Sequence, residues 1–553
     1  MALGILEPKE TQVAGTVHVK SQAESHTEAQ DTNRALKKDK TGTIILVPQP
    51  SDDPNDPLNW PLWQRDVILF ILSIVTVVAT TASPLLAADS VLLAIYFRTT
   101  FQKAANLTAF HLAGVAVGAV IFVPSARVWG KRHVFLLGAL LMCVTSAWGG
   151  STHNNRNYAS LLWARVFQGV ALAPFESLAN AVVGDLYFVH ERGPRMAFVN
   201  TAIFGGAFLT PVFVGMIAAH IGWQWSFYLL SIFSGIGFLA LFFFVPETAF
   251  RRADSLNTDM VTTATSSVVT ESSAASLNSD EKYLRMATSA GTAPDTARRA
   301  RDPYVRRLLP FNGKKSDDSF FKLLLRPFPL YLQPAVIWGC LMQGVIIGWT
   351  VMVGVILSLI FLSPPLFFTE EQSGKMYTAA FIGAMMGLVI SGVFTELVTR
   401  WLIRLNNGKY EPEYRILLAA PTLVFTAIGL YGFGITSANT YRYGWLIPEV
   451  FLAFIIASMV MGAVASAQYL LDAHRDIDVE IFTNLIIFKN IYSFVLAYFA
   501  YTWIFSTGIK HMFVIFASIE VAICCLSIPM YVLGKKNRAF FQKHDILRIA
   551  KLR

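Results

Sequence analysis

Ionisable and amide side chains interrupt several long apolar runs of this sequence. Arg165 and Glu176 lie in one run, and Lys489 lies in another, next to Asn490 and shortly after Asn484. A charged side chain inside hydrocarbon costs several kcal/mol unless it is paired or wetted, so each of these residues is a functional candidate. Groups of this kind can exchange protons or orient a polar solute. They are the first candidates for chemistry in the chain.

The spacing of these residues limits how they can cooperate. Arg165 and Glu176 are eleven residues apart, about 16 Å along one helix face, which is too far for a direct pair. Glu176 lies towards Asp185, Glu191 and Arg192, so a network of ion pairs that closes an inner gate is an alternative to substrate contact. Lys489 must face either a cavity or an acidic partner.

Other chemistry has less support in the sequence. The ten histidines are not clustered, and neither H-E-x-x-H nor G-x-S-x-G occurs, so we expect no enzymatic activity, no metal and no cofactor. Glu520 in the last apolar run could be protonatable or simply neutral in lipid. The cysteines lie in apolar runs without metal-ligand spacing, at Cys143, Cys340, Cys524 and Cys525.

The elements that carry these residues are long hydrophobic helices. Of the 553 residues, only 15% are charged, whereas a soluble protein carries about a quarter. Runs of about 20 apolar residues can cross a hydrocarbon core of about 30 Å. The sequence therefore predicts an all-α membrane protein with twelve transmembrane helices in two six-helix halves. The seventh run is too long for one upright helix and must tilt, kink or extend beyond the bilayer. The expected spans are 67–88, 107–125, 133–150, 159–181, 197–219, 225–246, 333–362, 377–397, 416–436, 445–470, 480–503 and 511–534.

Polar segments divide the chain into regions. We expect a polar tail over 1–60, a first half over 61–248, a disordered central loop over 249–325, a second half over 326–536 and a tail over 537–553. Lys and Arg gather in the even-numbered connections, which predicts that both termini are cytoplasmic. The polar start lacks a signal peptide, so the first span is expected to direct insertion. We expect a multi-pass protein of the plasma membrane.

Small residues recur at matching places in the two halves. Gly114 and Gly118 lie in the second span, and Gly383 and Gly387 repeat their spacing in the eighth. This spacing lets helix backbones approach closely, and its recurrence indicates an internal repeat. The N-x-[ST] sequon at Asn106 lies on the external side in this topology and is a candidate glycosylation site.

Several short strings occur in a fixed order along the chain. They are DPLNWP from Asp56, RVFQG from Arg165, GAFLTPVFVG from Gly206, VPETAFRR from Val245, NNGKYEPEYR from Asn406, FKN from Phe488 and GKKNR from Gly534. Together they resemble the major facilitator superfamily and, more narrowly, its fungal drug:proton antiporter-like branch. The resemblance covers nearly the whole chain from about residue 56. It implies two halves that rock about a central site.

The resemblance assigns roles to two spans. The string in the fifth span is similar to the antiporter motif GxxxGPxxGG, with Gly206, Pro211 and Gly215 retained and Thr210 in place of a glycine. Pro211 removes a backbone donor and bends the helix. The resemblance also implies a central cavity lined by the fourth span, where Arg165 couples protons or orients substrate. For Arg165 the alternative is hydrogen bonding to carbonyls of neighbouring helices.

Gln168, one turn after Arg165, belongs to the same motif, and close packing is the alternative to a role in the cavity. The loop after the second span departs from the family pattern. Where the usual GxxxDRxGRR-type signature has Asp, this chain has Arg127, although Gly130, Lys131 and Arg132 are retained. The usual charge latch is therefore not expected.

For that loop, Glu396 in the equivalent part of the second half is a candidate acidic partner. The combined interpretation is a monomeric, proton-coupled secondary transporter that exports a small hydrophobic or amphipathic drug, toxin or fungal secondary metabolite. Uptake of an organic cation or polyamine is the alternative, because similar permeases share the Asn-Asn-Gly loop. A nutrient sensor on the same scaffold also stays open. The expected partners are the substrate, protons and the lipid bilayer; the net charge of +9 sets orientation and does not indicate nucleic-acid binding.

Overall fold

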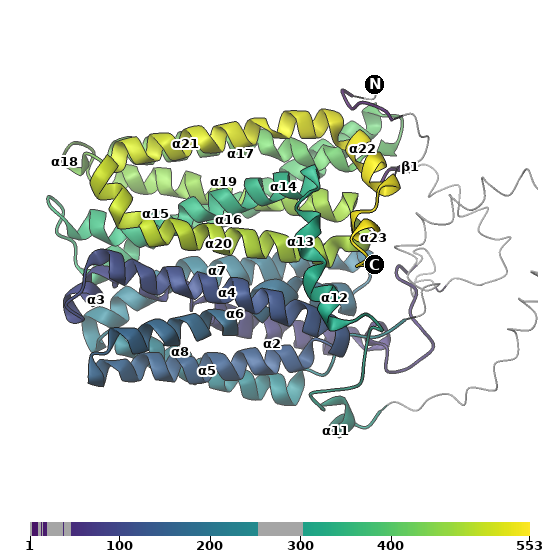
Figure 1. Ribbon diagram of the computed structural model, residues 1–553, viewed down its shortest axis with the longest axis horizontal. Coiled ribbons are helices and arrows are strands. Elements are labelled where there is room, and N and C mark those ends of the chain that lie inside the picture. The colour runs from purple at the N-terminus through teal and green to yellow at the C-terminus, as the bar shows by residue number, and fades with distance from the viewer. Residues whose placement is uncertain are drawn as a thin grey trace, which may run out of the picture.

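Long helices lie side by side in the computed structural model of the chain (Figure 1). Among the described residues, twelve helical segments are long and apolar enough to cross a membrane, which confirms the predicted all-α fold. Two short strands, β1 (Val17–His18) and β2 (Lys409–Tyr410), also pair antiparallel. The structure describes residues 3–8, 13, 15–18, 37, 46–252 and 302–552.

Six spanning helices form the first half. They are α2 (Leu62–Thr80), α4 (Phe101–Trp129), α5 (Arg132–Asn155), α6 (Tyr158–Leu186), α7 (Val189–Ile221) and α8 (Gln224–Phe244). The predicted first span continued to residue 88, but α2 ends at Thr80, before Pro84. Proline cannot donate the next helical hydrogen bond, so the chain continues as a short 3-10 turn, η2 (Pro84–Leu86), and then α3 (Ser90–Tyr96).

The second half repeats this pattern with longer segments. Its seventh span is interrupted by a π-helical turn, η4, which explains how the long apolar run fits. The eighth helix, α16, extends to Leu405, beyond the predicted end at residue 397. The elements are α14 (Pro334–Cys340), η4 (Leu341–Val345), α15 (Ile346–Leu362), α16 (Glu370–Leu405), η5 (Pro412–Leu418), α17 (Ala419–Ser437), α19 (Leu446–Ala473), α20 (Asp478–Thr507), α21 (Ile509–Cys525) and α22 (Ser527–Lys543).

Glycines at matched positions join equivalent helices in the two halves. A Cβ added at Gly114 or Gly118 of α4 would collide with the backbone of α6. A Cβ added at Gly383 or Gly387 of α16 would collide with the backbone of α19. The second helix therefore meets the fourth as closely as the eighth meets the tenth, and small residues permit both contacts.

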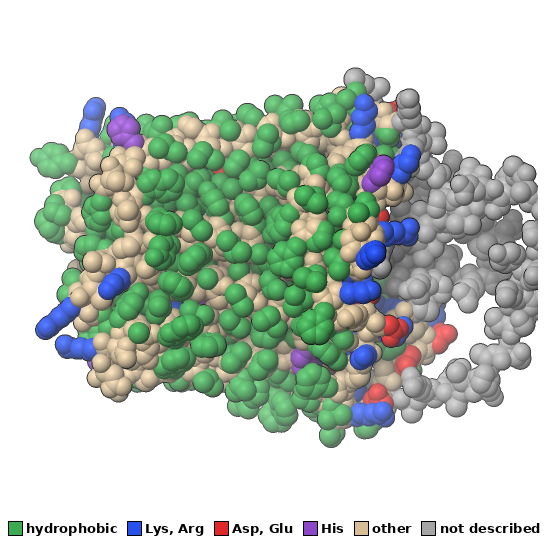
Figure 2. Space-filling view, in the orientation of Figure 1, with side chains coloured by type: hydrophobic (Ala, Val, Ile, Leu, Met, Phe, Trp, Pro, Cys, Tyr) green, Lys and Arg blue, Asp and Glu red, His purple; other side chains and the backbone are tan. Residues whose placement is uncertain are grey.

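The bundle has two ends that differ in charge. We call the end that carries both chain termini the terminal face, and the end that carries α3 and the short helix α18 (Thr440–Tyr443) the opposite face (Figure 1). Figure 2 shows hydrophobic side chains over the middle of the bundle, with Lys and Arg at both ends and Asp and Glu at the terminal face. Between the halves, the most extensive contacts are those of α4 with α20 and of α7 with α16.

Two segments predicted as polar regions outside the spans contain helices. Most of the predicted disordered loop lies outside the described residues, but its last part contains α11 (Tyr304–Arg307) and α12 (Phe320–Leu325). The region predicted as a C-terminal tail is helical, because α22 continues to Lys543 and a further turn, α23 (Ile546–Ile549), follows. Arg538 of this region is buried beneath the terminal face and pairs with acidic residues there. These pairs stabilise the continued helix.

Candidate functional site

Lys489 and Glu176 form an ion pair across the boundary between the halves. Lys489 Nζ of α20 donates to Glu176 Oε1 of α6, and Asn490 Nδ2 lies 3.5 Å from Glu176 Oε2. The Lys489 and Glu176 side chains are only 12% and 20% exposed. The structure thus unites three predicted residues and provides the acidic partner expected for the lysine. Asn484 lies apart from them and donates to the carbonyl of Pro327 at 2.7 Å.

Arg165 is fully buried, and backbone carbonyls hold its guanidinium. Its Nη1 donates to the carbonyl of Ala82 at 2.7 Å and to Gln168 Oε1, and Nη2 donates to the carbonyl of Ser83 at 3.3 Å. These bonds tie α6 to the break that follows α2. The geometry matches the packing alternative for both residues, and a role for Arg165 in proton coupling stays a prediction.

The altered loop after α4 carries an ion pair that links the halves. Arg127 Nη1 pairs with Glu480 Oε1 in the first turn of α20. Glu480 is almost fully buried and also lies 3.6 Å from Arg326 Nη1, while Arg326 pairs with Asp318 at 3.0 Å. A charge latch of another kind therefore forms, with its cation on α4 and its carboxylate on the other half. It differs from the usual latch, which needs an acid at position 127, because here Glu480 supplies the carboxylate.

The next residues of the loop hold the first half together. Lys131 Nζ pairs with Asp185 of α6 at 2.6 Å. Glu247 accepts hydrogen bonds from the backbone N–H groups of Lys131 at 2.9 Å and Arg132 at 3.0 Å. Gly130 has φ +98°, and a Cβ there would collide with the Glu247 carboxylate. The glycine is therefore required so that the loop can wrap around this carboxylate.

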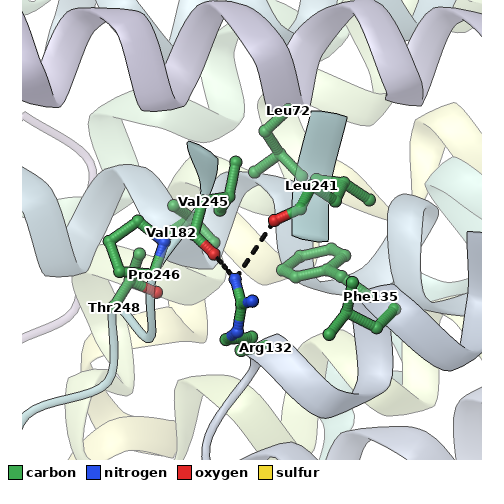
Figure 3. A pocket seen from close by; sticks show the side chains of 9 residues that line it. Leu72, Arg132, Phe135, Val182, Leu241, Val245, Pro246 and Thr248 are labelled. Carbon is green, nitrogen blue, oxygen red and sulfur yellow. Dashed lines mark hydrogen bonds between the residues drawn. The ribbon is translucent and has the colours of Figure 1, made fainter. Parts of the chain in front are cut away.

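The Arg132 guanidinium caps the end of α8. Nη1 donates to the carbonyl of Leu241 at 3.1 Å and to that of Val245 (Figure 3). The adjoining cavity is lined by Phe135 and Val182 among others and holds about 10 Å³, roughly the room for one water molecule. It lies within the first half, so it is a packing defect beside a structural arginine and not a binding site for a larger molecule.

Glu396 does not act as the acidic partner of a latch. It is exposed on α16 and pairs with Arg400 one turn later. The acids of the second half come instead from the NNGKYEPEYR string, where Glu413 binds Arg538 of α22 through two bonds of 2.8 and 2.9 Å. Glu411 also bonds Arg538, at 3.1 Å. The length of the helix explains the difference from the prediction, because α16 continues past Glu396 and this residue lies on an exposed helix face and not in a loop.

The antiporter-like string of α7 makes two backbone contacts. A Cβ on Gly206 would collide with α2, and a Cβ on Gly215 would collide with the backbone of Glu370 in α16, across the two halves. Thr210 Oγ1 donates back to the carbonyl of Gly206. Pro211 lies inside α7, and its carbonyl faces Gly374. The motif therefore brings α7 close to α2 of its own half and to α16 of the other half.

The opposite face also joins the halves. Ser90 Oγ and Ser358 Oγ lie 2.5 Å apart, and the backbone N–H of Tyr501 donates to Gln102 Oε1 at 3.0 Å. With Arg127 and Glu480 paired at the other end, the halves are in contact at both ends. Asn106 lies in the second turn of α4 and accepts a bond of 3.2 Å from Gln102, so the sequon is in a helix and its glycosylation stays a prediction.

Two buried carboxylates were missed by the sequence reasoning. Asp89 lies between η2 and α3, and Glu449 lies in the first turn of α19. Neither has a hydrogen-bond partner among the described residues. The signal was present, because each is a lone acid inside or beside an apolar run, as Glu520 is. Glu520 itself accepts a hydrogen bond of 3.0 Å from Trp349 Nε1.

Comparison with known proteins identifies the fold. Residues 67–475 match the sequence model of the Major Facilitator Superfamily. The chain belongs to this superfamily. The transporter is 25% identical to "Uncharacterized MFS-type transporter C1271.10c" of Schizosaccharomyces pombe, over 93% of this chain and 91% of that protein. It is also 25% identical to "Trichosetin biosynthesis cluster MFS transporter" of Gibberella fujikuroi, over 78% and 77%. The proton:xylose symporter XylE of E. coli shares the fold, with a TM-score of 0.56, 12% identity, and coverage of 85% and 96%.

Proposed function

We propose that this transporter exports a small hydrophobic or amphipathic molecule in exchange for protons, by alternating access of its two halves. The ion pair of Lys489 with Glu176 carries the proposal. Glu176 lies ten residues before the end of α6 at Leu186, hence about 15 Å inside the bundle. A charge pair at this depth is costly to maintain, which favours a mechanistic role.

Protonation of Glu176 would remove one member of this pair. Lys489 would then lose its partner, and the attraction that holds α6 of the first half to α20 of the second would weaken. Because only a difference in interaction energy between two conformations can shift their populations, a pair that spans the halves is suited to couple protonation to rocking. This argument supports proton coupling for Glu176 and Lys489 and leaves Arg165 as the organiser of the nearby backbone.

The contacts at the two ends would act as gates. Arg127 with Glu480 holds the terminal face closed, and Ser90 with Ser358 joins the halves at the opposite face. In alternating access one set must break while the other is kept. The pair of Arg127 with Glu480 can therefore serve as the gate at the terminal face, although this loop lacks the Asp of the family signature.

Export is favoured by one relative and by the motif in α7. The Gibberella fujikuroi relative is named for a biosynthesis cluster, which fits removal of a product from the cell. The string from Gly206 to Gly215 is similar to the antiporter motif. We further propose that the transporter acts as a monomer in the plasma membrane, with the terminal face in the cytoplasm, because Lys and Arg are frequent in connections at that face.

Uptake of an organic cation or polyamine is the second candidate. The buried carboxylates Asp89 and Glu449, which have no cationic side chain paired with them among the described residues, favour a positively charged cargo. They do not distinguish import from export.

The proposal is tested with the full chain in proteoliposomes under an imposed pH gradient. We expect the gradient to drive movement of an amphipathic dye such as Nile red or rhodamine 6G, and movement to stop when a protonophore collapses the gradient. Liposomes carrying the Lys489→Gln variant are the matched control and should show little driven transport. Equal movement with and without the gradient would overturn proton coupling.

A further inference from the structure

Two acidic side chains near the opposite face are buried without partners. Asp89 of the first half is fully buried, and Glu449 of the second half is 4% exposed. Both oxygens of each carboxyl lack a hydrogen-bond partner among the residues that the structure describes. A buried ionised carboxyl without a partner is strongly disfavoured, so such a group either keeps a proton or binds a cation. Two buried carboxyls without partners do not stabilise the fold, so stability does not explain why they are present.

Both carboxyls lie within electrostatic range of one aromatic residue, Tyr377 of α16. Tyr377 is buried and donates its hydroxyl to the carbonyl of Gly354 at 2.7 Å. Tyr501 of α20 lies near it, because its hydroxyl donates to the carbonyl of Val355, the residue after Gly354. Glu370 in the first turn of α16 adds a further negative charge near Asp89. The region is thus acidic and aromatic, and residues of both halves form it.

Asp89 is directly connected to the contact that joins the halves at this face. The next residue, Ser90, lies 2.5 Å from Ser358 of α15 through the two hydroxyl oxygens. Tyr501 donates its hydroxyl to the carbonyl of Val355, one turn earlier on α15. Separation of the halves here would therefore move Asp89 away from Glu449 and admit solvent to both.

We propose that Asp89 and Glu449 bind the positively charged group of the transported molecule, so that the cargo is an organic cation. This inference rests on the proposed transport function and names its substrate class. The two carboxylates supply the countercharge, and the buried rings of Tyr377 and Tyr501 add apolar surface for the organic part of the cargo. A cation held by both halves stabilises their contact at the opposite face, because it binds the closed arrangement better than the open one.

The test compares cationic and neutral probes in proteoliposomes. Rhodamine 6G and spermidine carry positive charge, whereas Nile red is a flat neutral dye. We expect Asp89→Asn and Glu449→Gln to lower the rate of cation transport about 30-fold or more, since loss of one member of a buried charge pair has an effect of this size. Movement of any neutral dye that the wild type carries should change much less.

Glu371→Gln is the matched control. Glu371 lies at the same end of α16 and pairs with Lys375 at 2.7 Å near the surface, and a pair of that kind contributes little. Thermal unfolding in detergent separates a binding role from a structural one, because Asp89→Asn and Glu449→Gln should unfold at or above the wild-type temperature. The reason is that each removes an unsatisfied acid and keeps its shape.

The outcomes are distinct. If the wild type carries the neutral dye but neither cation, or if both variants carry cations at the wild-type rate, the cation site is wrong while the transport proposal stands. If lower transport is matched by a large loss of thermal stability in both variants, the two acids are structural and the inference fails. If the gradient drives none of the three probes, the proposed function itself fails.

Discussion

Arg127 of α4 pairs with Glu480 of α20 in the other half, whereas Lys131, one turn later in sequence, pairs with Asp185 inside its own half. The two cations of this loop thus stabilise different contacts. Arg127 holds the two halves together, and Lys131 holds helices of the first half together. The side chain of Glu480 is 5% exposed, so its pair with Arg127 is poorly screened by solvent.

Arg127→Ala should open the terminal face. Removal of the cation leaves Glu480 with only the more distant Arg326, and we expect the population open at this face to rise about tenfold, equivalent to about 1.4 kcal/mol. Hydrogen–deuterium exchange of peptides from the terminal ends of α4 and α20 measures the change. Lys131→Ala is the control, and its faster exchange should be confined to α4, α5 and α6. The same exchange pattern in both variants would refute a separate inter-half role for Arg127.

Lys489→Ala should destabilise the transporter by about 2 kcal/mol, less than for a fully buried pair because Glu176 retains some contact with solvent. The double variant Lys489→Gln, Glu176→Gln should recover most of this loss, since neither partner then carries an unpaired charge. Both variants should lack proton-driven transport. Thermal unfolding and proteoliposome flux provide the two measurements. A double variant as unstable as the single one would show that the pair is not coupled.

The fold could be predicted from sequence because its signals are long and repeated. Twelve apolar runs fix the helices, and Gly114 with Gly118 identifies a contact that Gly383 with Gly387 reproduces. Boundaries were less accurate where local chemistry decides them. The first span was extended past Pro84, and the eighth was ended before Leu405, because hydropathy does not show where a polar helix turn continues into water.

The partners in the site were harder to predict, since each joins residues that are distant in sequence. Lys489 signalled that it needs an acid, but Glu176 is 313 positions away. The role of Glu480 as a partner was hard to predict, because it lies in the first turn of a helix, where acidic residues are common. Asp89 and Glu449 were visible as acids near apolar runs, yet only the three-dimensional structure shows that neither has a partner among the described residues.

Gly215→Ala should separate α7 from α16. The added methyl would overlap the backbone of Glu370 and Gly374, and overpacking of this kind costs about 1–3 kcal/mol. Gly205→Ala on the same helix is a matched control, because the nearest atom to its new Cβ is 4.0 Å away, on Phe381. We expect lower transport and an earlier thermal transition for the first variant alone. Equal tolerance of both would show that α7 and α16 can move apart without cost.

The segment before α2 should make stability depend on acid pH. Asp56 is fully buried and accepts bonds from Arg252 at 2.7, 3.1 and 3.2 Å and from Ser51. Burial acts to raise the pKa of Asp56, but the bonds and charge of Arg252 hold it below its usual value of 3.8. A carboxyl with a lowered folded pKa stabilises the protein above the unfolded pKa, and this contribution is lost as pH falls through the folded pKa.

Asp56→Asn should therefore lower the free energy of unfolding by about 2 kcal/mol at pH 6, where the wild-type carboxylate is charged. Below pH 3.8 the difference should shrink, because the unfolded chain takes up a proton at Asp56 first and the folded protein follows only as pH falls through its lower pKa. Thermal unfolding of both proteins in detergent, measured from pH 6 downwards, gives the two curves. Convergence at acid pH identifies the Asp56–Arg252 pair as the source. Curves that stay parallel would mean that the asparagine loses only shape or packing and that the charge of Asp56 contributes nothing.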